Sequence, residues 1–142
     1  MNDAHHSVVF IDNERETREA MQQVLEKSGF ALYAVENVQP AMQVLAMRDA
    51  VPDLIISDYR FKAGTTGVEA ILHLREEFNL DIPALIISGD SQISSLRDIK
   101  DNGIGFLHKL APHYELERTI LQLGEIALLL ARLVISLWMR LV

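Results

Sequence analysis

The chain has 142 residues and a mass of 16.0 kDa, and 49% of its residues are apolar, which suits one domain with one core. Its 13 Lys and Arg against 20 Asp and Glu give a net charge of −7. This balance argues against a nucleic-acid-binding protein, because phosphate contacts need clustered positive charge. The absence of cysteine excludes disulfides, thiolate nucleophiles and zinc–thiolate sites. Residues 1–7 are polar and lack the apolar stretch of a signal peptide, so we expect a cytoplasmic protein.

The charge is unevenly distributed along the chain. Residues 1–112 carry 17 acidic and 10 basic side chains, whereas residues 113–142 carry three of each and are otherwise mostly apolar. We therefore expect an acidic domain followed by an apolar tail with no net charge.

Short apolar runs alternate with segments of helical periodicity. The runs are uninterrupted by charge, which is typical of strands covered on both faces of a parallel sheet. The predicted strands are residues 8–11, 31–35, 54–56, 84–87 and 105–107. The predicted helices are residues 15–28, 41–48, 68–78, 91–102 and a fifth helix from residue 113 onward.

This alternation predicts an α/β fold, with a doubly wound parallel sheet and right-handed crossovers. No G-x-G-x-x-G follows the first strand, and no G-x-x-x-x-G-K-[ST] loop occurs in the chain, so both nucleotide-binding interpretations are excluded. The remaining layout is the flavodoxin-like five-stranded sheet with strand order 2-1-3-4-5.

Polar residues stand where the predicted strands end, which is where such sheets bind ligands. The strand order places the ends of the first and third strands side by side, so Asp12 and Asp58 would share one crevice. Two carboxylates in one pocket favour a bound cation, and oxygen ligands favour Mg²⁺. Ser88 after the fourth run and Lys109 after the fifth add a hydroxyl and an ammonium group. This combination predicts phosphoryl transfer to an aspartate.

Several segments, taken in order, are similar to one known family. They are residues 8–14 (VVFIDNE), 52–60 (PDLIISDYR), 67–70 (GVEA), 83–90 (PALIISGD) and 106–109 (FLHK). Each is weak alone, but their order and separations resemble the receiver domain of two-component response regulators over about residues 7–122. The segments around Ser88 and Lys109 are especially similar to receivers of hybrid sensor histidine kinases.

The resemblance implies that Asp58 accepts a phosphoryl group from the phosphohistidine of a sensor kinase or phosphotransfer protein. Asp12, Asp58 and the backbone carbonyl of Arg60 would hold Mg²⁺. Asn13 stands where the family usually has a second acidic ligand, so Mg²⁺ affinity should fall, with Glu14 as a partial compensation. Asn13 could also cap the first helix, with Glu16 as its capping-box partner.

The resemblance also assigns the switch. Lys109 would contact the phosphoryl group, Ser88 would move to hydrogen-bond it, and Phe106 would follow inward. Gly89, which lacks a side chain, would leave the phosphoryl group accessible. The output would be a changed protein-interaction surface around the fourth and fifth strands and helices.

Three further residues depart from the family pattern or would affect the lifetime of the phosphoryl group. Leu110 replaces the usual proline after Lys109, and we predict a trans peptide there because a cis bond before a non-proline residue costs about 3 kcal/mol. Arg60 and Asp90 border the path of the hydrolytic water in receivers. A bridge between their opposite charges would slow loss of the phosphoryl group.

The tail carries an apolar seam at alternating steps of four and three residues, which suits a parallel two-stranded coil. We interpret residues 1–122 as the receiver domain and residues 123–142 as an apolar extension of its fifth helix. Self-association into a homodimer is the leading hypothesis, beside packing on a partner protein or a further domain. Membrane contact is disfavoured, because residues 126–142 fall short of the roughly 20 needed to span a bilayer. The seam residues are Leu116, Ile120, Leu123, Ala127, Leu130, Val134, Leu137 and Leu141.

The leading functional hypothesis is therefore a phosphorylation-dependent receiver that is not an enzyme in the usual sense. One alternative is a pseudo-receiver, an interaction module whose phosphorylation is lost through Asn13 and Leu110. The other is a small Mg²⁺-dependent phosphatase with an aspartate nucleophile. Such enzymes typically place a second acid two residues after the nucleophile, where this chain has Arg60.

Overall fold

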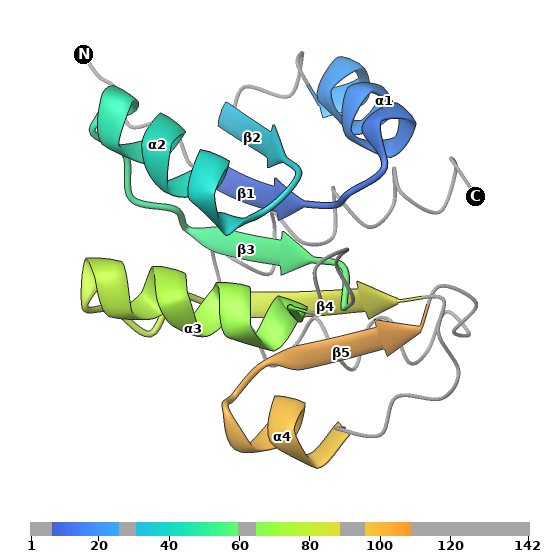
Figure 1. Cartoon of the computed structure of the whole chain (residues 1–142), viewed down its shortest axis with the longest axis vertical. Coiled ribbons are helices and arrows are strands. Elements are labelled where there is room, and N and C mark those ends of the chain that lie inside the picture. Colours follow the sequence, from blue (N-terminus) through green and yellow to red (C-terminus); the bar gives the residue numbers. More distant parts are fainter. Residues whose placement is uncertain (1–6, 26–30, 60–64, 89–95, 109–142) are drawn as a thin grey trace.

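The computed structural model describes residues 7–25, 31–59, 65–88 and 96–108. Within them, five strands form one parallel sheet in the order β2-β1-β3-β4-β5 (Figure 1). The strands are β1 (Ser7–Ile11), β2 (Ala31–Val35), β3 (Leu54–Ser57), β4 (Ala84–Ser88) and β5 (Gly105–His108). The predicted α/β class, strand positions and strand order are confirmed.

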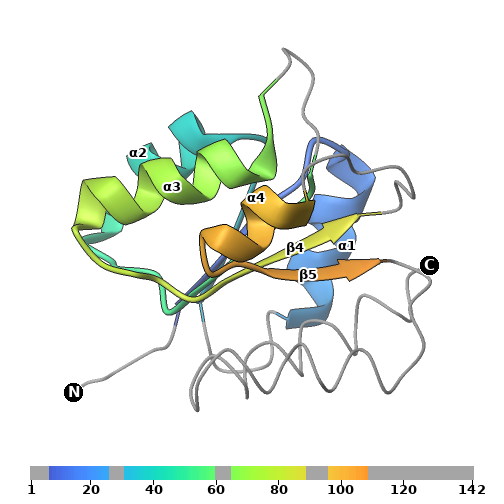
Figure 2. The same ribbon diagram turned by 90° about the horizontal axis from the view of Figure 1, so that it is seen from below.

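The helices of the described part lie on both faces of this sheet, which makes a three-layer sandwich. Figure 2 shows α2 and α3 on one face and α1 on the other, with α4 beside β5. Their bounds are α1 (Arg15–Leu25), α2 (Val38–Arg48), α3 (Gly67–Phe78) and α4 (Leu96–Asp101). This arrangement explains why the strands are continuously apolar, since a sheet covered on both faces has no solvent side.

One apolar core lies between the sheet and the helices α2, α3 and α4. Alternate residues of the central strands point into it, because successive strand side chains face opposite sides. The strand members include Val9, Ile11, Ile55 and Ile86, each fully buried. The helices contribute Ala41, Leu45, Val68, Ala70, Ile71, Leu74 and Ile99.

Helix α2 begins three residues earlier than its apolar pattern predicted. The side chain of Asn37 accepts a hydrogen bond from the Gln39 amide at 3.1 Å and caps the helix. Pro40 therefore falls in the first turn, where its missing N–H is not needed. The apolar periodicity that predicted residues 41–48 does not include this capped first turn.

At the amino-terminal ends of the strands, hydrogen bonds join β1 to the segment before β3. The buried Ser7 donates its hydroxyl to the Val51 carbonyl at 2.9 Å, and its amide to the Asp53 carboxylate at 2.8 Å. The Asp53 amide in turn donates to the Ser7 carbonyl at 2.8 Å. These bonds satisfy buried polar groups at the end of the sheet opposite to Asp12 and Asp58.

The predicted fifth helix and the apolar extension at residues 123–142 lie outside the described residues. The division at residue 122 therefore stays a prediction. In the ranges that are described, no helix combines the length and apolarity needed to cross a membrane.

Candidate functional site

Asp12 and Asp58 directly follow two neighbouring strands. Strands β1 and β3 pair with Ile11 opposite Ser57, and the Asp58 amide extends this ladder by donating to the Ile11 carbonyl at 3.0 Å. Each aspartate is thus one residue past a paired position, on strands about 4.8 Å apart. The register therefore places Asp12 and Asp58 next to each other at the carboxyl edge of the sheet, the position that the predicted strand order gives them; their shared role as a site stays a prediction.

Asp12 is held by the backbone around it. Its side chain is almost fully buried, and Oδ1 accepts a hydrogen bond from the Glu14 amide at 2.8 Å. Its amide donates to Val35 at the end of β2, and the Arg18 guanidinium donates to its carbonyl at 2.9 Å. A buried carboxylate held in this way keeps one orientation at the edge of the sheet.

Helix α1 is not capped by Asn13, the alternative that the sequence offered. The helix begins at Arg15, and its first turn closes with the Arg18 amide on the Glu14 carbonyl. Glu14 therefore holds the cap position, and its amide donates a hydrogen bond to the Asp12 carboxylate. Asp12 shapes this turn because its side chain reaches the amide two residues ahead, as aspartates do in turns. Asn13 is half-buried and Glu14 is exposed.

Asp58 is half-buried, and its carboxylate is anchored by its own backbone. Oδ1 accepts a hydrogen bond from the amide of Tyr59 at 2.8 Å. Tyr59 is itself a buried member of the core, and this packing keeps its amide within hydrogen-bonding distance of the carboxylate. The aspartate predicted to accept the phosphoryl group thus sits on a firmly packed residue.

Two residues that contact the Asp58 backbone, Ser57 and Gly67, were not predicted from the sequence as site residues. The Ser57 hydroxyl donates to the Asp58 carbonyl at 2.7 Å, and the Gly67 amide donates to the Tyr59 carbonyl at 2.7 Å. A Cβ on Gly67 would lie 2.3 Å from the Asp58 carbonyl oxygen. The available signal was a glycine in the first turn of a helix, where its cost suggests a close backbone approach.

Ser88 and Phe106 lie on the two strands beyond β3. Ser88 ends β4 and is buried, with only 3% of its surface exposed. Phe106 pairs with Ile86 across β4 and β5, is half-buried, and packs against the core. Ser88 is thus at the same edge of the sheet as Asp58, and Phe106 lies on the next strand at the border of the core.

The family model for the response regulator receiver domain matches residues 8–121 of this chain. The match covers both aspartates and the whole sheet except Ser7, the first residue of β1. The chain belongs to the receiver domain family. Its position in two-component signalling follows from this membership.

Relatives of this receiver domain include two transcriptional regulators. The chain is 32% identical over 87 residues to the phosphate regulon transcriptional regulatory protein PhoB of Pseudomonas aeruginosa. It is 30% identical over 106 residues to the C4-dicarboxylate transport transcriptional regulatory protein DctD of Rhizobium meliloti. These alignments cover 61% and 72% of this chain but only 37% and 22% of the relatives.

The fold of this receiver domain matches solved structures. Its TM-score to the chemotaxis protein CheY4 of Vibrio cholerae is 0.66 at 21% identity, covering 85% of this chain and 100% of that one. It is also 0.66 to the signal receiver domain of an HD domain-containing protein of Pseudomonas fluorescens at 20% identity, covering 87% and 98%. At these identities the likeness concerns the fold alone.

Receiver domains typically bind Mg²⁺, and the donors on this edge fit such an ion. Asp12 and Asp58 offer hard carboxylate oxygens, and Asp12 is a charged group taken almost wholly out of water. A cation offsets the mutual repulsion of two such groups. Residues 7–25, 31–59, 65–88 and 96–108 contain no cluster of three or more histidine or acidic side chains arranged around a common point. Among these residues, the donors that fit Mg²⁺ are the carboxylates of Asp12 and Asp58.

Several predicted site residues lie outside the described residues: Arg60, Gly89, Asp90, Lys109 and Leu110. The bridge between Arg60 and Asp90, the role of Lys109 and the trans peptide before Leu110 therefore stay predictions.

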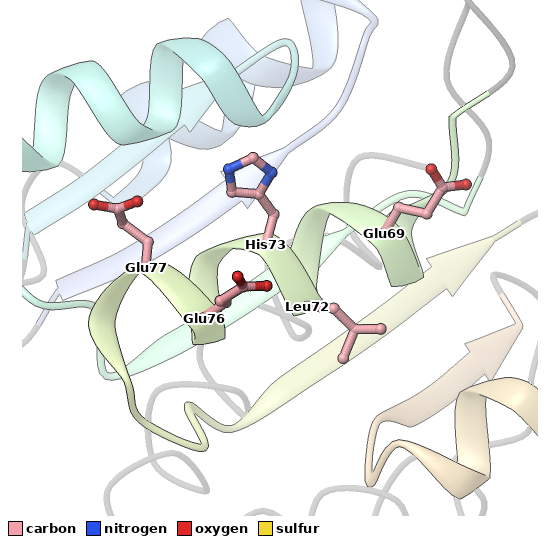
Figure 3. Close-up of a pocket in the computed structure, with 5 residues that line it drawn as sticks. All are labelled: Glu69, Leu72, His73, Glu76 and Glu77. Atoms are coloured by element: carbon pink, nitrogen blue, oxygen red, sulfur yellow. The ribbon is translucent and has the colours of Figure 1, made fainter.

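A hollow of about 570 Å³ lies on the exposed side of α3, and neither Asp12 nor Asp58 lines it. Figure 3 shows that its side chains spread along the helix and do not converge on one point. The lining residues are Glu69, Leu72, His73, Glu76 and Glu77. A solvated, acidic helix face explains them better than a binding site does.

Proposed function

We propose that this receiver domain is a phosphoacceptor of a two-component phosphorelay, with Asp58 as the accepting residue. The observation that carries the proposal is the pairing of Asp12 and Asp58 at adjacent strand ends, each anchored by a backbone amide. A nucleophile that is already oriented loses little entropy on reaching the transition state. The partner is a sensor histidine kinase or a phosphotransfer protein.

In the proposed reaction an Asp58 oxygen attacks the phosphorus of a phosphohistidine. The P–O bond forms as the P–N bond breaks, and the departing imidazole takes up a proton from water. Asp12, Asp58, the Asn13 amide oxygen and the Arg60 carbonyl would hold Mg²⁺, which would neutralise charge on the transferred group. Lys109 would contact a phosphoryl oxygen, while Glu14, Gly89 and Asp90 border the site and modulate it.

Phosphorylation would be passed on through β4 and β5. Ser88 would turn to the phosphoryl group, and Phe106 would fill the space that opens between β5 and the core. The surface of α4 and β5 would then present a changed face to a partner. A homodimer formed through residues 123–142 is the assembly that we propose for this output.

The test is incubation of the full chain with phosphoramidate and Mg²⁺, followed by intact-mass and peptide mass spectrometry. We expect the mass of one phosphoryl group to be added on Asp58, and no addition when Mg²⁺ is chelated before the donor is added. The Asp58→Asn variant, which keeps the size and the hydrogen bond from Tyr59, should remain unmodified. If the wild-type chain gains no phosphoryl group while remaining folded, the pseudo-receiver is the better description.

A further inference from the structure

We propose that Ser57 is a positioning residue for Asp58, acting through the peptide group between Asp58 and Tyr59. This inference deepens the proposed function and rests on it, because it concerns how the phosphoacceptor is held. Ser57 does not itself touch the phosphoryl group. It holds the backbone that in turn holds the reactive carboxylate.

The peptide group after Asp58 is fixed at both of its polar atoms. Its carbonyl oxygen accepts the Ser57 hydroxyl at 2.7 Å, and its N–H, on Tyr59, donates to Asp58 Oδ1 at 2.8 Å. A trans peptide is planar, with its carbonyl and N–H pointing in opposite directions. The hydroxyl therefore sets the direction in which the N–H meets the carboxylate.

Ser57 and Asp58 act on opposite sides of the sheet. Ser57 continues the row of Ile55 that faces α3, and it is fully buried. Asp58, the next residue, faces the other way because strand side chains alternate. The hydroxyl and the carboxylate thus communicate through the shared peptide, and each hydrogen bond polarises the group that makes the other.

Gly67 closes this arrangement from the side of α3. A Cβ at Gly67 would lie 2.3 Å from the Asp58 carbonyl oxygen and 2.9 Å from Ser57 Oγ. The helix start therefore packs directly on the bond between this hydroxyl and this carbonyl. The Gly67 amide also donates to the next carbonyl, that of Tyr59, at 2.7 Å. The peptide has little room to rotate while the hydroxyl remains.

The variant that tests this role is Ser57→Ala, and Ser7→Ala is its matched control. Ser7 is also buried and also donates its hydroxyl to a backbone carbonyl, at 2.9 Å, but at the opposite end of the sheet. Each variant loses one comparable hydrogen bond, so the two should lose comparable stability. Only Ser57→Ala should affect the carboxylate.

Phosphorylation of the full chain by phosphoramidate is measured over a series of donor concentrations, well below the unfolding temperature. We expect Ser57→Ala to slow the rate at saturating donor about tenfold, because misplacement of the nucleophile weakens transition-state positioning. The donor concentration for half-maximal rate should stay unchanged, and Ser7→Ala should match the wild type. Equal rates for all three proteins, or equal slowing in both variants, would overturn the role of Ser57.

The Tyr59 amide provides a readout that does not need phosphorylation. In the wild type and in Ser7→Ala, hydrogen exchange of this amide, measured by NMR, should be slow because its proton is donated to Asp58 Oδ1. In Ser57→Ala the exchange rate should rise about tenfold relative to Ser7→Ala, and equal rates in the two variants would refute the inference. A wild-type chain whose Tyr59 amide exchanges slowly but which gains no phosphoryl group would reject the proposed function and leave the positioning intact.

Discussion

Gly67 and Gly103 are both glycines near helix ends, but they are needed for different reasons. Gly103 has a φ of +67°, a left-handed conformation that side chains rarely adopt, and no heavy atom lies within 4 Å of its would-be Cβ. Gly67 has no such backbone requirement, but a Cβ there would meet the Asp58 carbonyl. Gly103 is required for its backbone conformation, whereas Gly67 is required because a side chain would collide with the Asp58 carbonyl.

We expect Gly67→Ala to lower the free energy of unfolding by about 2 kcal/mol and to slow Asp58 phosphorylation. The added methyl group faces backbone, which cannot move aside as a flexible side chain can. Gly103→Ala should cost about 1 kcal/mol through its backbone conformation and leave the phosphorylation rate of the folded protein unchanged. Urea titration and the phosphoramidate assay measure the two quantities. A Gly67→Ala chain that is phosphorylated at the wild-type rate would show that the contact is unimportant for Asp58.

The aspartates could be predicted from the sequence, whereas the role of Ser57 could not, and Gly67 gave only the signal of a glycine at the start of a helix. Asp12 and Asp58 each end an apolar run, and the strand order alone brings such ends together. The role of Ser57 depends on one side-chain hydrogen bond to the Asp58 carbonyl and on the packing of Gly67 against it, and neither is contained in an apolar pattern. The alternative in which Asn13 caps the first helix is wrong, because the first turn closes on the Glu14 carbonyl and the Glu14 amide donates to Asp12.

At the scale of elements, Arg75 joins α3 to two loops. Its guanidinium donates to the Ile82 carbonyl at 2.9 Å, to Asn102 at 2.6 Å, and to Gly103 at 3.4 Å. Burial lowers the pKa of Arg75, and the nearby Asp81 partly offsets this effect. Arg75 thus connects the turn between α4 and β5 to α3 by hydrogen bonds. These bonds link the proposed output surface to the helix that begins beside Asp58.

We expect Arg75→Met to lower the free energy of unfolding by about 2 kcal/mol, because the carbonyls of Ile82 and Asn102 lose a charged donor. Methionine keeps most of the apolar stem, so the loss reports mainly the hydrogen bonds. Arg15→Met is the matched control. Its ion pair with Glu19, at 2.9 Å, is exposed and should contribute less than about 0.5 kcal/mol. Similar losses in urea titrations of the two variants would argue against a special role for Arg75.

The apolar runs predicted the strands well because both faces of this sheet are covered, so no polar alternation obscures them. Helix boundaries were harder to predict, as α2 shows. Its first turn is set by the cap at Asn37 and not by apolar periodicity. Capping depends on one side-chain hydrogen bond, which a hydrophobic pattern does not contain.

At the scale of the whole molecule, charge and hydropathy divide the chain into two parts. The described elements belong to the acidic part, whose net charge of −7 over residues 1–112 equals that of the full chain. The carboxylates of Asp12 and Asp58 add to this charge at one edge, which favours the approach of a cation. The apolar tail has no net charge, so its association would depend on its seam and not on attraction between charges.

We therefore expect light scattering to give the full chain twice the mass of its 16.0 kDa protomer. Leu130→Glu should return it to the protomer mass, because the seam would have to bury an unpaired carboxylate. Gln122→Glu is the control, since it adds the same charge at a polar residue outside the seam, and it should remain dimeric. A wild-type chain at the protomer mass would eliminate self-association and direct the search to a partner protein. Loss of the dimer in both variants would assign the effect to charge and not to the seam.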